Sequence, residues 1–178
     1  EVILVSGPTS LPLPRTDIKL VPVRSAEEMR KAVFNYLDAS SVVIKAAAVS
    51  DYRPKIFSQK KIKKGESKST LALERTKDIL EELGKRKGNR ILVGFAAETE
   101  NLMANAKKKL KEKNLDFIVV NDVTRPGSGF AGDTNQVKIL YSSGQVKDLP
   151  LMTKEEVSQH ILDNVMELLK KRQGARRR

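Results

Sequence analysis

The sequence predicts an α/β protein built on a doubly wound, Rossmann-like and mostly parallel sheet in three layers. Two observations lead to this fold class. Short runs of β-branched and other apolar residues alternate along the chain with segments whose apolar residues recur every three or four positions, as on one face of a helix. The helical segments are long enough to return the chain across a sheet, which parallel neighbouring strands require.

The first half of the chain opens with two expected strands, residues 2–6 and 18–23, in which β-branched residues dominate. Ser25 has the pattern of a helix N-cap, because Glu28 follows three residues later and completes a capping box. A strand over residues 42–49 is expected after this helix. The helix carries an apolar stripe formed by Met29, Ala32, Val33, Tyr36 and Leu37.

The second half continues the alternation. Thr153 and Glu156 have the pattern of a second capping box, which begins the last helix. The strand that starts at Phe117 closes on Asn121 and Asp122. The expected elements are extended chain at 70–73, a helix at 78–87, a strand at 91–96, a helix at 99–113, strands at 117–120 and 136–141, and the last helix with its stripe of Val157, Ile161, Val165, Leu168 and Leu169.

The length of 178 residues predicts one compact domain, residues 1–169, followed by a basic tail. Six of the nine residues in the tail, 170–178, are basic, and we expect this end to be solvated and disordered. No apolar run approaches the roughly 20 residues of a membrane helix, and no signal peptide is visible, so a soluble cytoplasmic protein is expected.

The composition also excludes several kinds of chemistry. Zero cysteines remove disulfides, thiolate metal sites and a thiol nucleophile. The single histidine, His160, makes a histidine triad or a multi-histidine metal site hard to build, and we expect it to be structural. The net charge of +12 favours an anionic partner.

A lysine loop is the clearest candidate for the site that binds this anionic partner. Lys60, Lys61, Lys63 and Lys64 lie between Pro54 and a glycine, which predicts an exposed, flexible segment. Charge alone fits a solvated loop equally well. The loop follows the carboxyl end of an expected strand, where open α/β sheets bind ligands, and this position favours a lysine flap over a polyphosphate.

Two further motifs have weaker signals. Lys109 and Lys113 share a face of the helix at 99–113 and would repel each other unless an anion lay across them, although Glu112 fits a plain solvated face. The glycines of 127–132 have the spacing of a dinucleotide fingerprint. They lead into a strand instead of a helix, so a mobile glycine loop near a site is the better interpretation.

Several motifs together resemble the bacterial phosphopantothenoylcysteine synthetases, often the C-terminal half of a bifunctional protein whose other half is an FMN-dependent decarboxylase. The similarity runs in order from the start of the chain to about Leu169. The motifs are AAAVSDYRP at 46–54, KIKK at 61–64, TKDIL at 76–80, GFAAET at 94–99 and NDV at 121–123.

The resemblance implies a CTP-dependent ligase of coenzyme A biosynthesis that forms an acid–amino acid amide. Its substrates would be CTP, 4′-phosphopantothenate and L-cysteine. The carboxylate would be activated as an acyl-cytidylate with release of pyrophosphate, and cysteine would then displace CMP. Such a reaction needs alignment and charge neutralisation by lysines and Mg²⁺, and no enzyme nucleophile. The resemblance also implies a homodimer.

The family's site residues carry over to matching positions of this chain. Lys61 is the implied catalytic flap lysine on the phosphates, Asp51 an acidic nucleotide contact and Phe95 part of the cytosine pocket. Asn121 and Asp122 are implied at the edge of the site, and no metal ligand is implied. The remaining implied CTP contacts are Thr76, Lys77, Asp78 and Ile79, in a turn where the family often has proline at the position of Lys77, and the two helix lysines Lys109 and Lys113.

Family members carry a glycine-rich strand and loop, with a catalytic asparagine, before the position of Glu1. We therefore expect this chain to bind CTP more readily than it completes turnover. Two other classes stay open on the residues alone. One is a dinucleotide-dependent reductase on the same fold, and the other is a basic nucleic-acid-binding module, which the 4% aromatic content disfavours.

Overall fold

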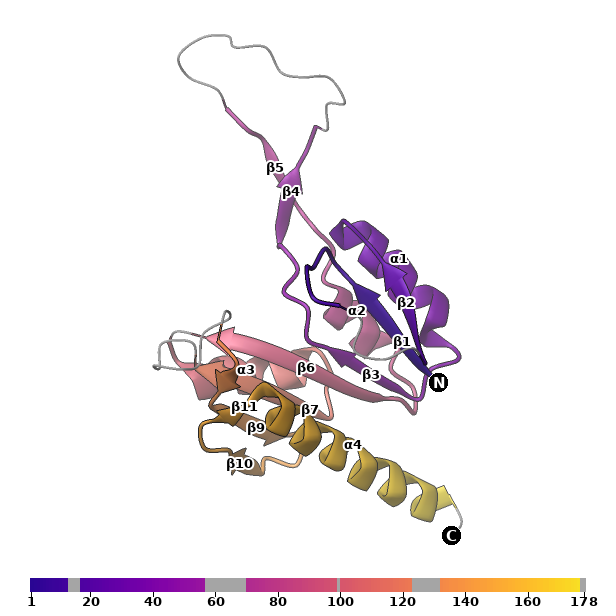
Figure 1. Ribbon diagram of the computed structural model, residues 1–178, viewed down its shortest axis with the longest axis vertical. Coiled ribbons are helices and arrows are strands. Elements are labelled where there is room, and N and C mark those ends of the chain that lie inside the picture. Colours follow the sequence, from indigo (N-terminus) through magenta and orange to yellow (C-terminus); the bar gives the residue numbers. More distant parts are fainter. Residues whose placement is uncertain (13–16, 57–69, 99, 123–131, 177–178) are drawn as a thin grey trace. The chain divides into compact units, whose positions relative to one another are not determined.

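A computed structural model describes residues 1–12, 17–56, 70–98, 100–122 and 132–176 of the protein (Figure 1). The chain divides into two compact units, which we call unit 1 (Glu1–Asp38 and Ala47–Ile79) and unit 2 (Ala39–Ala46 and Leu80–Arg178). The lysine flap at 60–64 and most of the glycine loop lie outside the described residues. None of the helices in the described ranges is long and apolar enough to cross a membrane.

Unit 1 begins with a parallel pair of strands, β1 (Val2–Ser6) and β2 (Ile18–Pro22), which α1 (Ala26–Leu37) follows. The N-cap at Ser25 is confirmed, because its side-chain oxygen accepts a hydrogen bond from the Glu28 amide at 3.2 Å. The Glu28 carboxylate reaches back one residue further than a standard capping box and accepts from the Arg24 amide at 2.8 Å.

A short antiparallel stem completes unit 1. It pairs β4 (Tyr52–Pro54) with β5 (Leu73–Arg75). The pairing was absent from the sequence prediction, because three-residue exposed strands carry no apolar alternation that could reveal them. An ion pair between Arg53 and Glu74, with 2.8 Å between Nε and Oε1, crosses the stem.

Unit 2 holds the central sheet, in the strand order β10-β9-β7-β6-β3. The strands β3 (Val42–Lys45), β6 (Ile91–Glu98) and β7 (Phe117–Asp122) are parallel, which confirms the predicted α/β fold. The later strand β9 (Val137–Tyr141) and β10 (Val146–Asp148) are antiparallel to their neighbours.

The sheet of unit 2 lies between helices. Helix α4 (Lys154–Arg176) covers one face, and α2 (Ile79–Lys85) and α3 (Leu102–Glu112) cover the other (Figure 1). On the second face, a Cβ added at Gly94 would lie 2.8 Å from Leu115 and 3.0 Å from Leu80. The core on the α4 face consists of Ile91, Val93, Phe117, Val119, Val137, Ile139, Leu149, Val157, Ile161 and Val165.

The ends of several elements differ from their predicted positions, and three of these differences are described here. β3 ends at Lys45, four residues before the predicted strand does, because Ala46, Ala47 and Ala48 have a low strand propensity. α3 begins at Leu102 instead of 99, after Asn101 with φ 50°. α4 runs to Arg176, so residues 170–176 of the predicted tail belong to this helix.

Small strands flank the start of α4, where β8 (Thr134–Asn135) pairs with β11 (Met152–Thr153). The predicted capping box of α4 is confirmed in full. The Glu156 carboxylate accepts from the Thr153 amide at 2.8 Å, and the Glu156 amide donates to the Thr153 hydroxyl oxygen at 3.1 Å.

Candidate functional site

Unit 1 brings together two of the implied CTP-binding motifs, which are distant in sequence. The Thr76 amide donates to the backbone oxygen of Asp51 at 2.9 Å, and the Thr76 hydroxyl donates to the backbone oxygen of Ser50 at 2.6 Å. The β4–β5 stem explains this contact, because its pairing of Tyr52 with Arg75 sets the preceding and following residues side by side. The two motifs therefore form one local structure.

The Asp51 side chain is exposed at the base of this stem. It interacts electrostatically with Arg75, whose Nε donates to the Tyr52 hydroxyl oxygen at 3.4 Å. The hydrogen bond to Tyr52, and to a smaller extent the charge of Asp51, raise the pKa of the Arg75 guanidinium. Asp51 is thus an acceptor at the surface of unit 1, beside a permanent cation.

A cleft of about 350 Å³ lies next to this pair of motifs within unit 1. Ser50 and Thr76 line it, together with Ser25 at the N-terminal end of α1. Arg24 and Arg53 add positive charge, and Glu27 is the only carboxylate among its lining residues. Because a helix N-terminus and arginine side chains both attract negative charge, the cleft is suited to an anionic group.

The turn at 76–79 exposes Lys77 and Asp78, whereas Ile79 is 2% exposed and belongs to the core. The Ile79 side chain therefore anchors the turn, and only its backbone is available to a ligand.

The other implied site residues lie in unit 2, on two different faces of its sheet. Phe95, on β6, pairs in register with Val119 of β7 and packs against the core beneath α4. Lys109 and Lys113 lie on or at the end of α3, which covers the opposite face. Within unit 2 the structure therefore does not bring Phe95 close to these lysines.

The lysines of α3 divide into two groups by exposure. Lys109 and Lys113 are partly buried, whereas Lys107, Lys108 and Lys111 are exposed. The first pair, four residues apart, lies beside the buried face of α3 that Ala106 and Leu110 form.

The remaining predicted residues have structural contacts. Asn121, near the end of β7, donates from Nδ2 to the Asn135 side-chain oxygen at 3.3 Å. His160 lies on α4, and its backbone oxygen accepts from Asn164 at 2.7 Å. Within the described ranges, no group of three or more acidic or histidine side chains could hold a metal ion.

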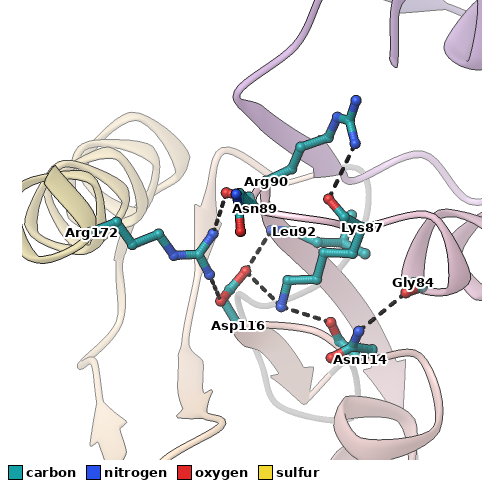
Figure 2. A network of polar contacts seen from close by, with 8 residues as sticks. All are labelled: Gly84, Lys87, Asn89, Arg90, Leu92, Asn114, Asp116 and Arg172. Atoms are coloured by element: carbon teal, nitrogen blue, oxygen red, sulfur yellow. Dashed lines mark hydrogen bonds and ion pairs between the residues drawn. The ribbon is translucent and has the colours of Figure 1, made fainter. Parts of the chain in front are cut away.

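A buried polar network in unit 2 escaped the sequence prediction (Figure 2). The Asp116 carboxylate, 9% exposed, accepts from the Leu92 amide at 2.7 Å and from Lys87 Nζ at 3.0 Å, and it also pairs with Arg172. A cavity of about 820 Å³ beside it is lined by Lys87, Arg90 and Arg172 among others. The only sequence signal was a lone carboxylate directly before the apolar run of β7.

The parallel strands of unit 2, with helices on both faces of the sheet, define an α/β fold of the class in which ligands bind at the carboxyl ends of the strands. The family model of the DNA/pantothenate metabolism flavoprotein C-terminal domain matches residues 1–169, and the chain belongs to this family.

Known proteins with similar sequences and folds support this assignment. The coenzyme A biosynthesis bifunctional protein CoaBC of Bacillus subtilis (strain 168) is 50% identical over 170 residues, which are 96% of this chain and 42% of that protein. A cysteine/cysteine sulfinic acid decarboxylase from an unknown prokaryotic organism is 43% identical, over 95% of this chain and 47% of that protein. The chain thus spans less than half the length of these two relatives.

A solved structure agrees with the fold. The crystal structure of the C-terminal domain of the bifunctional protein CoaBC has a TM-score of 0.80 and 43% identity, and the match covers 96% of this chain and 76% of that one.

Proposed function

We propose that this chain is the phosphopantothenate–cysteine ligase of coenzyme A biosynthesis. The observation that carries the proposal is the match, over 96% of the chain, to the separately crystallised C-terminal domain of CoaBC. The decarboxylase name of the second relative belongs to a protein about twice as long, of which this chain covers 47%. That name therefore does not decide what the shared part does.

In the proposed reaction, a carboxylate oxygen of 4′-phosphopantothenate attacks the α-phosphate of CTP. The bond between the α-phosphate and the bridging oxygen breaks, and pyrophosphate leaves. The amine of cysteine then attacks the acyl carbon, loses a proton and displaces CMP. Both steps need aligned reactants and neutralised phosphate charge, which suits a chain with no cysteine and one histidine.

The chain's own residues have proposed roles in binding. In unit 1, Asp51 accepts from the nucleotide, and the backbone of residues 76–79 contacts it. In unit 2, Lys109 and Lys113 bind the triphosphate, and Phe95 contributes to the cytosine pocket. Lys61, which lies outside the described residues, is proposed to act on the phosphates during both steps.

Magnesium would supply further charge neutralisation on the phosphates. The described residues offer no cluster of acidic side chains that could form a cage for it. Mg²⁺ usually keeps several waters and binds largely through substrate phosphates. We assign no protein ligand to it. A homodimer is likewise part of the proposal, on the family resemblance alone.

The decisive experiment is a thermal-shift titration with CTP, ATP and NADPH in the presence of Mg²⁺, followed by an assay for CMP and pyrophosphate. We expect stabilisation by CTP, because a ligand that binds only the folded state raises its stability. CMP formation should require both phosphopantothenate and cysteine. Stabilisation by NADPH alone would favour a reductase, and release of CO₂ from cysteine without CTP would favour a decarboxylase.

The flap lysine gives a sharper test of the same function. Lys61→Met should lower kcat by about 100-fold, because one charged group that stabilises developing charge is typically worth that much. Lys108→Met removes the same charge from an exposed position on α3 and should leave kcat within about twofold. Equal rates for the two variants would contradict the assigned role of Lys61.

A further inference from the structure

Gly84 lies inside α2, where a glycine weakens the helix and needs another explanation. A Cβ added at this position would overlap the backbone oxygen of Lys113 and lie 2.7 Å from its carbonyl carbon. These atoms are backbone and cannot rotate away. Gly84 therefore allows the end of α3 to approach α2 more closely than any other residue would.

The end of α3 is itself well defined. Asn114 has φ 49°, its amide donates to the backbone oxygen of Lys111 at 3.2 Å, and the Leu115 amide donates to that of Leu110 at 3.0 Å. These two bonds form a Schellman motif, and Leu110 and Leu115, at the two positions that commonly make its apolar contact, are both buried. The turn that follows Lys113 thus has one conformation.

Polar contacts attach this turn to α2 and to the chain that follows it (Figure 2). Asn114 Nδ2 donates to the backbone oxygen of Gly84 at 3.1 Å. Lys87 Nζ donates to the backbone oxygen of Asn114 at 2.9 Å and pairs with Asp116 at 3.0 Å. With its side chain 10% exposed, Lys87 is held inside the protein instead of extending into water.

We propose that Gly84, Lys87 and Asn114 are positioning residues that hold Lys109 and Lys113 for the triphosphate of the nucleotide. This inference rests on the proposed function. Lys113 directly precedes the fixed turn, and its amide donates to the backbone oxygen of Lys109 at 3.0 Å, so both lysine backbones move with it. A lysine side chain is flexible, and a fixed base reduces the freedom that phosphate binding must remove.

The first test uses two glycines in helices. Gly84→Ala should raise the Kd for CTP at least about tenfold, because small displacements of binding groups are costly. Gly174→Ala in α4, where an added Cβ meets nothing within 4 Å, is the matched control and should leave the Kd unchanged. Isothermal titration well below the Tm of each variant separates affinity from stability. An unchanged Kd for folded Gly84→Ala would overturn the inference.

The second test uses the polar contacts. Asn114→Gly keeps the left-handed turn but loses the side-chain amide. Both this variant and Lys87→Met should raise the KM for CTP and leave the KM for phosphopantothenate unchanged. Lys85→Met, which removes an exposed ion pair with Glu81, is the control. If KM for both substrates rises equally, the contacts are merely structural.

A double-mutant cycle links these residues to the lysines themselves. In a background that carries both Lys109→Met and Lys113→Met, Gly84→Ala should weaken CTP binding no further, because both side chains that it positions are already absent. Full additivity would overturn the inference. Failure of the proposed function has a different outcome, since the unaltered protein would then bind no CTP, and both proposals would fall together.

Discussion

A single carboxylate, Asp116, connects three distant parts of unit 2. It is paired with Lys87 from the end of α2 and with Arg172 from α4, while the Leu92 amide of β6 donates to it. The sequence could not reveal this group, because its partners lie far away along the chain and each looks like an ordinary surface charge. A buried carboxylate with several donors is stabilised only as long as they remain in place.

Asp116→Ala should therefore destabilise the protein by about 3 kcal/mol, because it leaves two partly buried cations without their partner. Urea unfolding measures this change. Glu81→Gln, which breaks the exposed pair with Lys85, should cost less than about 0.5 kcal/mol and serves as the control. A loss below about 1 kcal/mol for Asp116→Ala would show that the network contributes little to stability.

Tyr141 gives a prediction of pH dependence at the same scale. Its hydroxyl donates to Asn164 Oδ1 at 2.7 Å, and burial, with a smaller contribution from Glu167, raises the pKa of Tyr141 above 10.0. The unfolded state releases this proton at lower pH than the folded state does. The stability contributed by the neutral side chain is therefore complete below pH 10.0 and is lost as the pH rises through the folded pKa.

Tyr141→Phe lacks this proton. Its stability should fall less steeply above pH 10 than that of the unaltered protein, although it is less stable near neutrality because Asn164 loses a donor. Urea unfolding at a series of alkaline pH values compares the two slopes. Parallel slopes would contradict the role given to Tyr141.

At the scale of elements, the sequence predicted helix starts reliably where a side chain caps its own helix. Both N-caps, at Ser25 and Thr153, were predicted from residues three apart and are confirmed. The stem of β4 and β5 was not predicted, because it depends on pairing across a long intervening segment. The contact of Thr76 with Asp51 is a consequence of that pairing, so the resemblance could name both residues but the sequence pattern could not place them together.

The capping box of α4 can be tested by one substitution on each side. Thr153→Ala should cost about 1 kcal/mol of unfolding free energy, as loss of an N-cap commonly does. Hydrogen bonds from Thr153 lower the pKa of Glu156 below 4.5. The ionised carboxylate therefore contributes to the stability of the fold above that pH, and this contribution is lost as the pH falls through the folded pKa. The difference in stability between the unaltered protein and Glu156→Gln should therefore be smaller below pH 4 than at pH 7. Thermal unfolding at the two pH values measures it. A constant difference would exclude the carboxylate as its source.

For the whole molecule, the sequence predicted the α/β class because alternating strand and helix periods survive without any tertiary information. It did not predict the antiparallel direction of β9 and β10, which depends on how the chain returns after β7. The basic C-terminal end shows the same limit. Its composition indicated a solvated tail, yet Arg172 within it contacts Asp116 and the backbone oxygen of Asn89.

Two truncations distinguish the charge of this end from its packing. Removal of residues 170–178 takes away six basic residues and lowers the net charge from +12 to +6, whereas removal of 174–178 takes away three and keeps Arg172. A salt titration with non-specific DNA tests the nucleic-acid alternative: if the tail carries such binding, the slope of log K against log salt should fall by up to about 5 in the first truncation and about half as much in the second. Only the first truncation should also lose stability, by about 1 kcal/mol, because a partly exposed charged hydrogen bond to Asp116 disappears. Salt titrations and urea unfolding measure the two effects separately. Equal stability of both truncated chains would show that Arg172 does not anchor α4. An unchanged salt slope, or no DNA binding by the unaltered protein, would show that the tail is not a nucleic-acid-binding segment.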